Sequence, residues 1–165
     1  MILKFSLIFK NDHISIAEYK SSDPQFLPIS LAMGHSSQEY LFVTSQINNQ
    51  VQVFLDGKQQ GVLKLNDSKY FTSVRNVHTI ADSDNISQVV VLDNGGFHFF
   101  AENGLYIRTV LSGAGFKYRG LGHIHYEGNL CLISLDVNER SNGGTEVVII
   151  NVEAKSQQCN SIVKR

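Results

Sequence analysis

Short apolar segments separated by polar turns run along the whole chain and predict β-strands. Many are rich in Val, Ile and Phe and are bounded by Gly, Asn or Asp, as in residues 89–92 and 50–54. No long segment carries the apolar period of an amphipathic helix, and the thirteen glycines fall mostly between the apolar segments. The pattern therefore predicts an all-β protein, built as a sandwich, a barrel or a propeller.

An internal repeat decides among these three architectures. Phe26, Phe71 and Phe116 are spaced 45 residues apart, and each stands shortly before an extended segment. First strands are predicted at 30–33, 75–78 and 120–123, second strands at 40–44, 89–93 and 130–134, third strands at 50–54, 97–100 and 146–150, and fourth strands at 61–65, 105–111 and 160–163. Four strands in about 45 residues is typical of one propeller blade.

The repeat divides the chain into a half blade and three blades of a single partial propeller. The blades are predicted at 21–65, 66–111 and 112–165, and residues 1–20 supply only a third and a fourth strand, at 2–9 and 14–19. The three phenylalanines are expected to be buried anchors between blades, because a repeated apolar residue usually serves packing. The inner edge of residues 2–9 would lack a partner strand, which predicts self-association.

The first full repeat resembles an NHL repeat. It has a Phe-x-Pro entry at 26–28, the core Asn48-Asn49-Gln50-Val51-Gln52-Val53-Phe54 and an Asp-Gly turn at 56–57, with Asn49 in place of the namesake histidine. The second repeat keeps Leu92-Asp93-Asn94 but loses the proline and the Asn-His core, and the third keeps only the hydrophobic skeleton.

This resemblance implies a role in binding. NHL propellers commonly have six blades and stand at the C-terminus of tripartite-motif (TRIM) proteins, so the chain is similar to the C-terminal half of such a domain. In that family the propeller binds a protein partner or RNA, and a RING domain, whose cysteine cluster is absent here, carries ubiquitin ligase activity. The expected function is a non-catalytic binding module that recruits a protein partner or substrate for a larger protein, and RNA binding is the alternative.

Two loops combine aromatic and basic residues at equivalent repeat positions. Both are predicted on the side where the connections between blades meet the loops between second and third strands. Single-stranded nucleic acid requires positive charge beside exposed rings. The candidate binding residues are Lys69, Tyr70 and Arg75 in one loop and Lys117, Tyr118 and Arg119 in the other, of which Lys69, Tyr118 and Arg119 are preferred. Alternatively, these charges only solvate the rim of the protein.

Histidines recur on the predicted first strands, which line the channel of a propeller. His78 and His123 are 45 residues apart, and His35 and His125 are 90 apart. His78, His123 and His125 are the candidates for a metal site or for acid–base chemistry, as in a metal-dependent hydrolase or lyase. No carboxylate shares their spacing, and an isolated pair lacks the ligand count that a metal site requires. We therefore predict no metal, no cofactor and no catalysis.

Charge and cysteine content add little to this prediction. Fourteen Lys and Arg balance fifteen Asp and Glu, so net charge does not favour nucleic acid as a partner. The two cysteines form no metal-binding or redox motif. Residues 1–9 are interpreted as a strand, with a signal peptide as the alternative, and no apolar segment is long enough to span a membrane. A soluble cytoplasmic protein without a membrane partner is expected.

Overall fold

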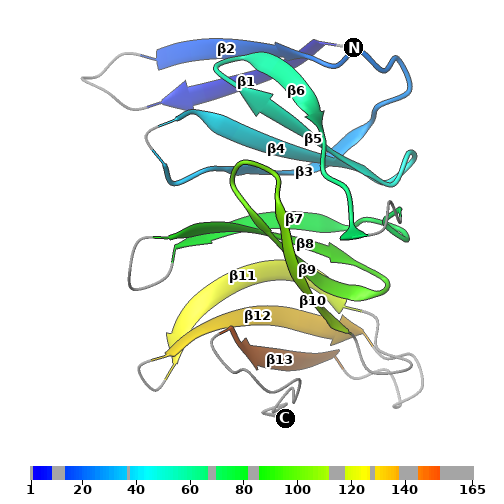
Figure 1. Cartoon of the computed structure of the whole chain (residues 1–165), viewed down its shortest axis with the longest axis vertical. Coiled ribbons are helices and arrows are strands. Elements are labelled where there is room, and N and C mark those ends of the chain that lie inside the picture. Colours follow the sequence, from blue (N-terminus) through cyan, green and yellow to red (C-terminus); the bar gives the residue numbers. More distant parts are fainter. Residues whose placement is uncertain are drawn as a thin grey trace.

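The structure is a computed structural model that describes residues 2–8, 14–36, 38–66, 70–81, 86–111, 118–126, 129–137 and 145–152. These residues form thirteen β-strands in four antiparallel sheets and contain no α-helix, which confirms the all-β prediction (Figure 1). No helix in the described part of the chain has the length and hydrophobicity that crossing a membrane requires.

Each sheet is built from strands that are consecutive in the sequence. A hairpin of β1 (Ile2–Ile8) and β2 (Ile14–Lys20) comes first. The second sheet contains β3 (Pro28–Met33), β4 (Tyr40–Ser45), β5 (Gln50–Leu55) and β6 (Lys58–Val62). The third contains β7 (Asn76–Ala81), β8 (Ser87–Asp93), β9 (Gly96–Ala101) and β10 (Tyr106–Leu111). The fourth contains β11 (Tyr118–Tyr126), β12 (Asn129–Val137) and β13 (Thr145–Asn151).

The strand boundaries differ from the predicted ones at a few places. Strand β6 begins at Lys58, earlier than predicted, because Asp56 and Gly57 both have positive φ (49° and 79°) and close a two-residue hairpin. The first strand of the last sheet begins at Tyr118 and not at Gly120. The fourth strand predicted at 160–163 lies outside the described residues.

The core lies between the sheets, and β8 contributes to two parts of it. Val89 and Val91 face the second sheet and pack in a cluster with Phe42, whereas Val90 and Leu92 face the fourth sheet. All four of these β8 side chains are fully buried, because alternate residues of a strand point to opposite faces and both faces are covered. A third cluster, around Phe54, lies between β2 and the second sheet. Phe26 and Phe71 are buried, as predicted for anchors, and Phe116 lies outside the described residues.

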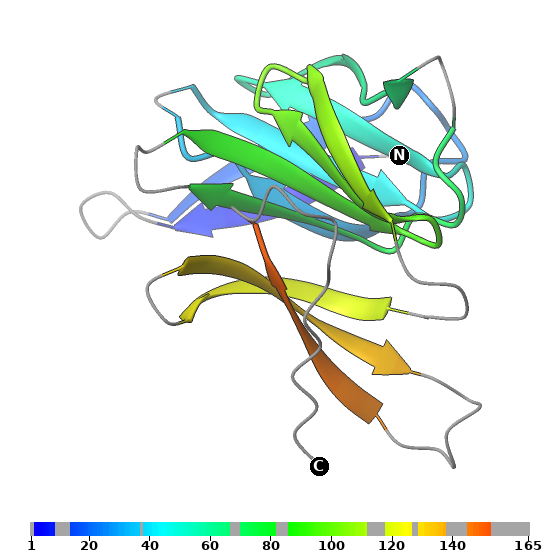
Figure 2. The same cartoon turned by 60° about the horizontal axis from the view of Figure 1, so that its bottom comes forward.

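The four sheets follow one another as an open series, with β1–β2 at one end and β11–β13 at the other (Figure 1). The first strands of successive full sheets, β3, β7 and β11, lie next to one another. In the turned view of Figure 2, the last sheet diverges from the other three sheets. The connection from β2 to β3 contacts the β4–β5 turn, and the connection from β6 to β7 contacts both the β4–β5 turn and the β8–β9 turn. The candidate site lies at the second of these connections.

Candidate binding face

A small pocket opens where the connection from β6 to β7 passes the turn between β4 and β5. It has a volume of about 90 Å³ and is lined by Asn49, Gln50, Val62, Leu63, Lys64, Tyr70 and Phe71. Phe71 and Leu63 are buried, whereas the neighbouring Tyr70 is 87% exposed. Sites for drug-sized ligands and cofactors usually measure several hundred cubic ångströms. This pocket therefore has room for one side chain rather than for a cofactor.

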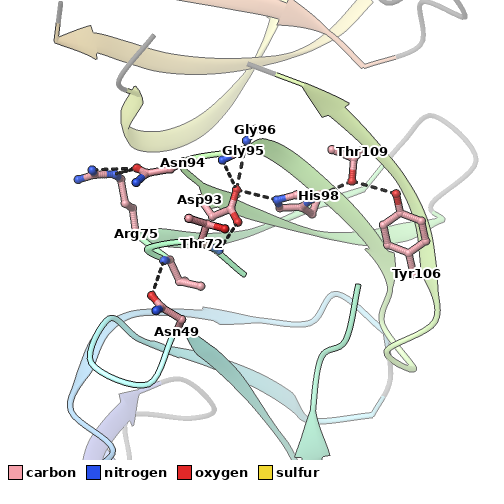
Figure 3. Close-up of polar contacts among 11 residues, drawn as sticks. Asn49, Thr72, Arg75, Asp93, Asn94, Gly95, Gly96, His98, Tyr106 and Thr109 are labelled. Atoms are coloured by element: carbon pink, nitrogen blue, oxygen red, sulfur yellow. Dashed lines mark hydrogen bonds and ion pairs between the residues drawn. The ribbon is translucent and has the colours of Figure 1, made fainter. Parts of the chain in front are cut away.

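The backbone around the pocket is held by side-chain hydrogen bonds from two sheets. Asn49 in the β4–β5 turn adopts a left-handed φ of 50°, which asparagine tolerates better than most residues. Its Oδ1 accepts a hydrogen bond from the Val74 N–H at 3.3 Å (Figure 3). Arg75 donates to Asn94 Oδ1 through Nε at 3.2 Å and through a terminal nitrogen at 3.0 Å. These bonds hold the Asn49 side chain at the pocket and the backbone that follows Phe71. Groups that are held in place before binding lower the entropy cost of binding.

Asp93 organises this region from below the surface. Its Oδ2 accepts the Thr72 N–H at 2.7 Å, and its Oδ1 accepts the N–H groups of Gly95 at 2.6 Å and Gly96 at 3.1 Å (Figure 3). One carboxylate thus ties the β8–β9 turn to the connection that lines the pocket. Burial opposes its ionisation, but hydrogen bonds from His98 and Thr72 outweigh this effect and lower the pKa of Asp93.

A relay of side chains continues from Asp93 across the third sheet. His98 Nε2 lies 2.7 Å from Asp93 Oδ1, His98 Nδ1 lies 2.8 Å from Thr109 Oγ1, and Thr109 Oγ1 lies 2.9 Å from the Tyr106 hydroxyl. The whole relay is satisfied when Tyr106 donates to Thr109, Thr109 donates to His98, and His98 donates to Asp93. This assignment follows from the hydrogen-bond network.

The order hydroxyl–imidazole–carboxylate resembles that of a nucleophilic triad, but its burial argues against catalysis. His98 and Asp93 are each 4% exposed, and Phe71 packs edge-on against the His98 ring, with centroids 5.5 Å apart. The Phe71 ring thus lies on both the pocket and the imidazole. A catalytic base must reach the proton that it removes from a substrate or nucleophile, and the burial of His98 and Asp93 leaves no room for a substrate beside them. We therefore interpret this relay as structural.

The predicted aromatic-basic residues differ in their exposure to solvent. Tyr70 is exposed and Arg119 is exposed at the start of β11, but Arg75 is half-buried and bonded to Asn94. Tyr118 is only 4% exposed and packs on Phe97 with ring centroids 5.0 Å apart, so the prediction of an exposed Tyr118 ring was wrong. As the first residue of β11, it lies on the face that meets the third sheet. Lys69 and Lys117 lie outside the described residues.

The candidate histidines also differ in their positions and contacts. His78 on β7 and His123 on β11 are in contact, whereas His125 is exposed on β11. His35 lies beyond the end of β3, and not on the strand as predicted, with its Nε2 3.4 Å from the Thr79 carbonyl oxygen. Among the described residues, no three His, Cys, Asp or Glu side chains gather closely enough to hold a metal ion.

Sequence reasoning missed the Asp93–His98 pair and the pocket. The available signal was an aspartate before a glycine-rich turn, followed by a histidine in the next strand. Comparison of the sequence with models of known protein families and with curated proteins gives no match. The NHL resemblance therefore stays a prediction that rests on the quoted motifs.

Proposed function

We propose that this chain is a non-catalytic binding module, part of an NHL-type propeller, that recruits a protein partner by accepting one side chain of that partner. The observation that carries this proposal is the mainly apolar pocket beside an 87% exposed tyrosine. Exposed tyrosines supply large contact area at low entropy cost and are enriched at interfaces. The proposed parent is a larger protein of the cytoplasm, and a RING ubiquitin ligase is the family's example.

The size and chemistry of the pocket favour a partner with an apolar anchor residue. Val62, Leu63 and Phe71 form its apolar wall, and Lys64 and Asn49 supply polar groups at its edge. A few residues that fill pockets at the centre of an interface contribute most of its binding energy. The expected ligand is therefore a protein segment with one aliphatic or aromatic side chain flanked by hydrogen-bonding or acidic groups.

The test uses a phage-displayed library of short random peptides panned against the folded chain. Selected peptides should share one apolar residue, and titrating one of them should shift the amide NMR signals of Asn49, Gln50 and Lys64. Replacement of Tyr70 by alanine (Y70A) should weaken binding at least tenfold. Leu105, which is 68% exposed and does not line the pocket, gives the matched control L105A. Equal binding by both variants, or no shared residue, would reject the proposal.

RNA binding is the second candidate, because Tyr70 places an exposed ring close to the exposed Lys64. Stacking of one base on an aromatic ring contributes about 1–3 kcal/mol. Two of the residues predicted to bind RNA do not support this function, because the Tyr118 ring is buried and Arg75 is hydrogen-bonded to Asn94. Titration with a single-stranded oligouridine at low and moderate salt separates the two candidates. Salt-sensitive binding that Y70A abolishes, without peptide binding, would favour RNA.

A further inference from the structure

The wall of the pocket that Phe71 forms depends on two sheets. Most of the pocket lining belongs to the second sheet and to the segments that adjoin it. Phe71, by contrast, lies on the connection to the third sheet and is 5% exposed. Its ring packs against two rings of β9, with centroids 5.5 Å from His98 and 6.0 Å from Phe100. It also lies in a cluster with Leu63, which follows β6. The place of Phe71 is therefore set by the third sheet as well as by the second.

Hydrogen bonds hold the connection to the third sheet directly after this wall. The Thr72 N–H donates to Asp93 Oδ2 at 2.7 Å, and the Thr72 carbonyl oxygen accepts the Asn94 N–H at 2.9 Å. Three residues later, the Arg75 N–H donates to the Leu92 carbonyl oxygen at 2.9 Å. Of these three bonds, the first uses a side chain as its acceptor, so a single substitution can remove it.

The backbone at Ser73 needs such support. Ser73 has a φ of 57°, in the left-handed region, which costs free energy for any residue with a Cβ atom. Such a conformation persists where the surrounding structure holds it. Loss of the Thr72–Asp93 bond, one residue earlier in the chain, should let this segment relax and move Phe71 with it.

An equivalent bond occurs one repeat earlier. Ser45 ends β4 as Asp93 ends β8, and Ser45 Oγ accepts the Leu27 N–H at 3.2 Å. Leu27 and Thr72 are 45 residues apart, which is the period of the repeat. At Asp93 the acceptor is a carboxylate and the bond is shorter, at 2.7 Å. Because charge-assisted hydrogen bonds are stronger than neutral ones, the connection that carries the pocket wall is held more tightly than its equivalent.

We propose that Asp93, together with His98, is a positioning residue of the binding pocket. Asp93 holds the backbone that follows Phe71, and the His98 ring supports the Phe71 ring, so the pair sets where this wall stands. The position of Phe71 in turn decides how closely the partner's anchor side chain can pack, and well-packed anchors contribute most of the binding energy of an interface. The inference rests on the proposed function and adds two buried residues that control affinity without touching the partner.

The two carboxylate oxygens of Asp93 share its hydrogen bonds unequally. Oδ1 accepts the N–H groups of Gly95 and Gly96 and lies 2.7 Å from His98 Nε2. Oδ2 accepts only the Thr72 N–H among these donors. Asparagine has a single acceptor oxygen. In Asp93→Asn that oxygen should stay with the three donors, which leaves the amide group facing the Thr72 N–H. The substitution should therefore remove the bond to the connection and keep the bonds within the third sheet.

The experiment compares Asp93→Asn with Glu102→Gln, a matched change from carboxylate to amide in the same sheet. Glu102 follows the other end of β9, does not line the pocket and also joins two sheets. Isothermal titration calorimetry measures binding of a peptide selected by the panning described above, at neutral pH, with circular dichroism to check that each chain is folded. Asp93→Asn should weaken binding at least tenfold, and Glu102→Gln should weaken it less than about twofold.

Amide hydrogen exchange provides a readout that a general loss of stability would not change. In Asp93→Asn, the Thr72 amide should exchange at least tenfold faster relative to the Gly96 amide, because only the Thr72 bond is lost. In the wild-type chain the coupling must act in both directions. The bound peptide should therefore slow exchange at Thr72 and leave it unchanged at Ser36, whose N–H is bonded to Glu102. This wild-type measurement tests the inference even if Asp93→Asn does not fold.

Three results would overturn the inference and leave the proposed function intact. They are equal peptide binding by Asp93→Asn and the wild-type chain, equal weakening by Glu102→Gln, and a Thr72 amide whose exchange the bound peptide does not change. A wild-type chain that binds no selected peptide would overturn both proposals, so the two failures are distinguishable.

Discussion

His78 Nε2 on β7 lies 2.7 Å from His123 Nδ1 on β11, a hydrogen bond that joins the first strands of two successive sheets. One ring must donate and the other accept, so the bond needs at least one neutral imidazole. Burial of His78, together with the positive charge that His123 and His35 acquire on protonation, lowers the pKa of His78 below 6.5. The contact is therefore sensitive to pH.

The first prediction is a loss of stability as the solution is acidified. Because the pKa of His78 is lower in the folded chain than in the unfolded chain, the unfolded chain takes up the proton first. Stability from this group is fully present above about pH 6.5 and declines as the pH falls below it, until the folded form is also protonated. Urea unfolding between pH 8 and pH 5 measures the slope. His78→Gln should reduce it, and the exposed His125→Gln should not. An identical slope in both variants would contradict the prediction.

The second prediction concerns the Asp93 network. Asp93→Ala removes the acceptor for three backbone N–H groups and for His98, and the contacts to Gly96 and His98 are buried. We expect a loss of about 3 kcal/mol in the free energy of unfolding, as for other broken buried pairs. Chemical denaturation measures the loss. Asp56→Ala, at an exposed turn residue, is the control, and it should lose much less even though its φ of 49° disfavours alanine. Similar losses of unfolding free energy in the two variants would contradict the stabilising role of the Asp93 network.

Glu102 provides the third prediction, because it joins two sheets on the side away from the pocket. Its carboxylate accepts hydrogen bonds from the backbone N–H groups of His35 and Ser36 and from the Ser87 hydroxyl. Burial opposes ionisation, but these hydrogen bonds prevail and lower the pKa of Glu102. Its contribution to stability is therefore present above about pH 4.5 and is lost as the pH falls through the folded pKa.

Glu102→Gln tests this link between the two sheets at neutral pH. The amide has one acceptor oxygen instead of two and carries no charge, so we expect a loss of about 1–3 kcal/mol. The matched control is Glu39→Gln at an exposed position, which should change stability by less than about 0.5 kcal/mol. Equal unfolding midpoints for the two variants would show that the Glu102 carboxylate does not stabilise the contact between the two sheets.

The fourth prediction separates the two tyrosines that the sequence placed in the same role. Tyr118→Ala should cost about 3–5 kcal/mol in unfolding free energy, because the ring is buried against Phe97. Tyr70→Ala should change stability by less than about 0.5 kcal/mol, because the ring is exposed. Thermal and urea unfolding of the two variants provide the comparison. A stable Tyr118→Ala chain would mean that Tyr118 faces solvent after all.

The sequence by itself determined the strands and their order. Short apolar segments, Asp-Gly and Asn-Gly turns and the spacing of Phe26 and Phe71 are local signals, because turn residues and strand alternation act within a few positions. For this reason the order of strands within the described sheets could be predicted. Strand alternation then places Val89 and Val91 on one face of β8, as the structure has them.

Only the tertiary structure decided which of those faces are covered. Tyr70 and Tyr118 look alike in the sequence, yet one is exposed and one is buried, because burial depends on a neighbouring sheet that is distant in the chain. The His78–His123 bond and the exposure of Leu31 have the same origin. Strand alternation assigns a side chain to a face, but the partner of that face comes from packing between sheets, and no local pattern encodes it.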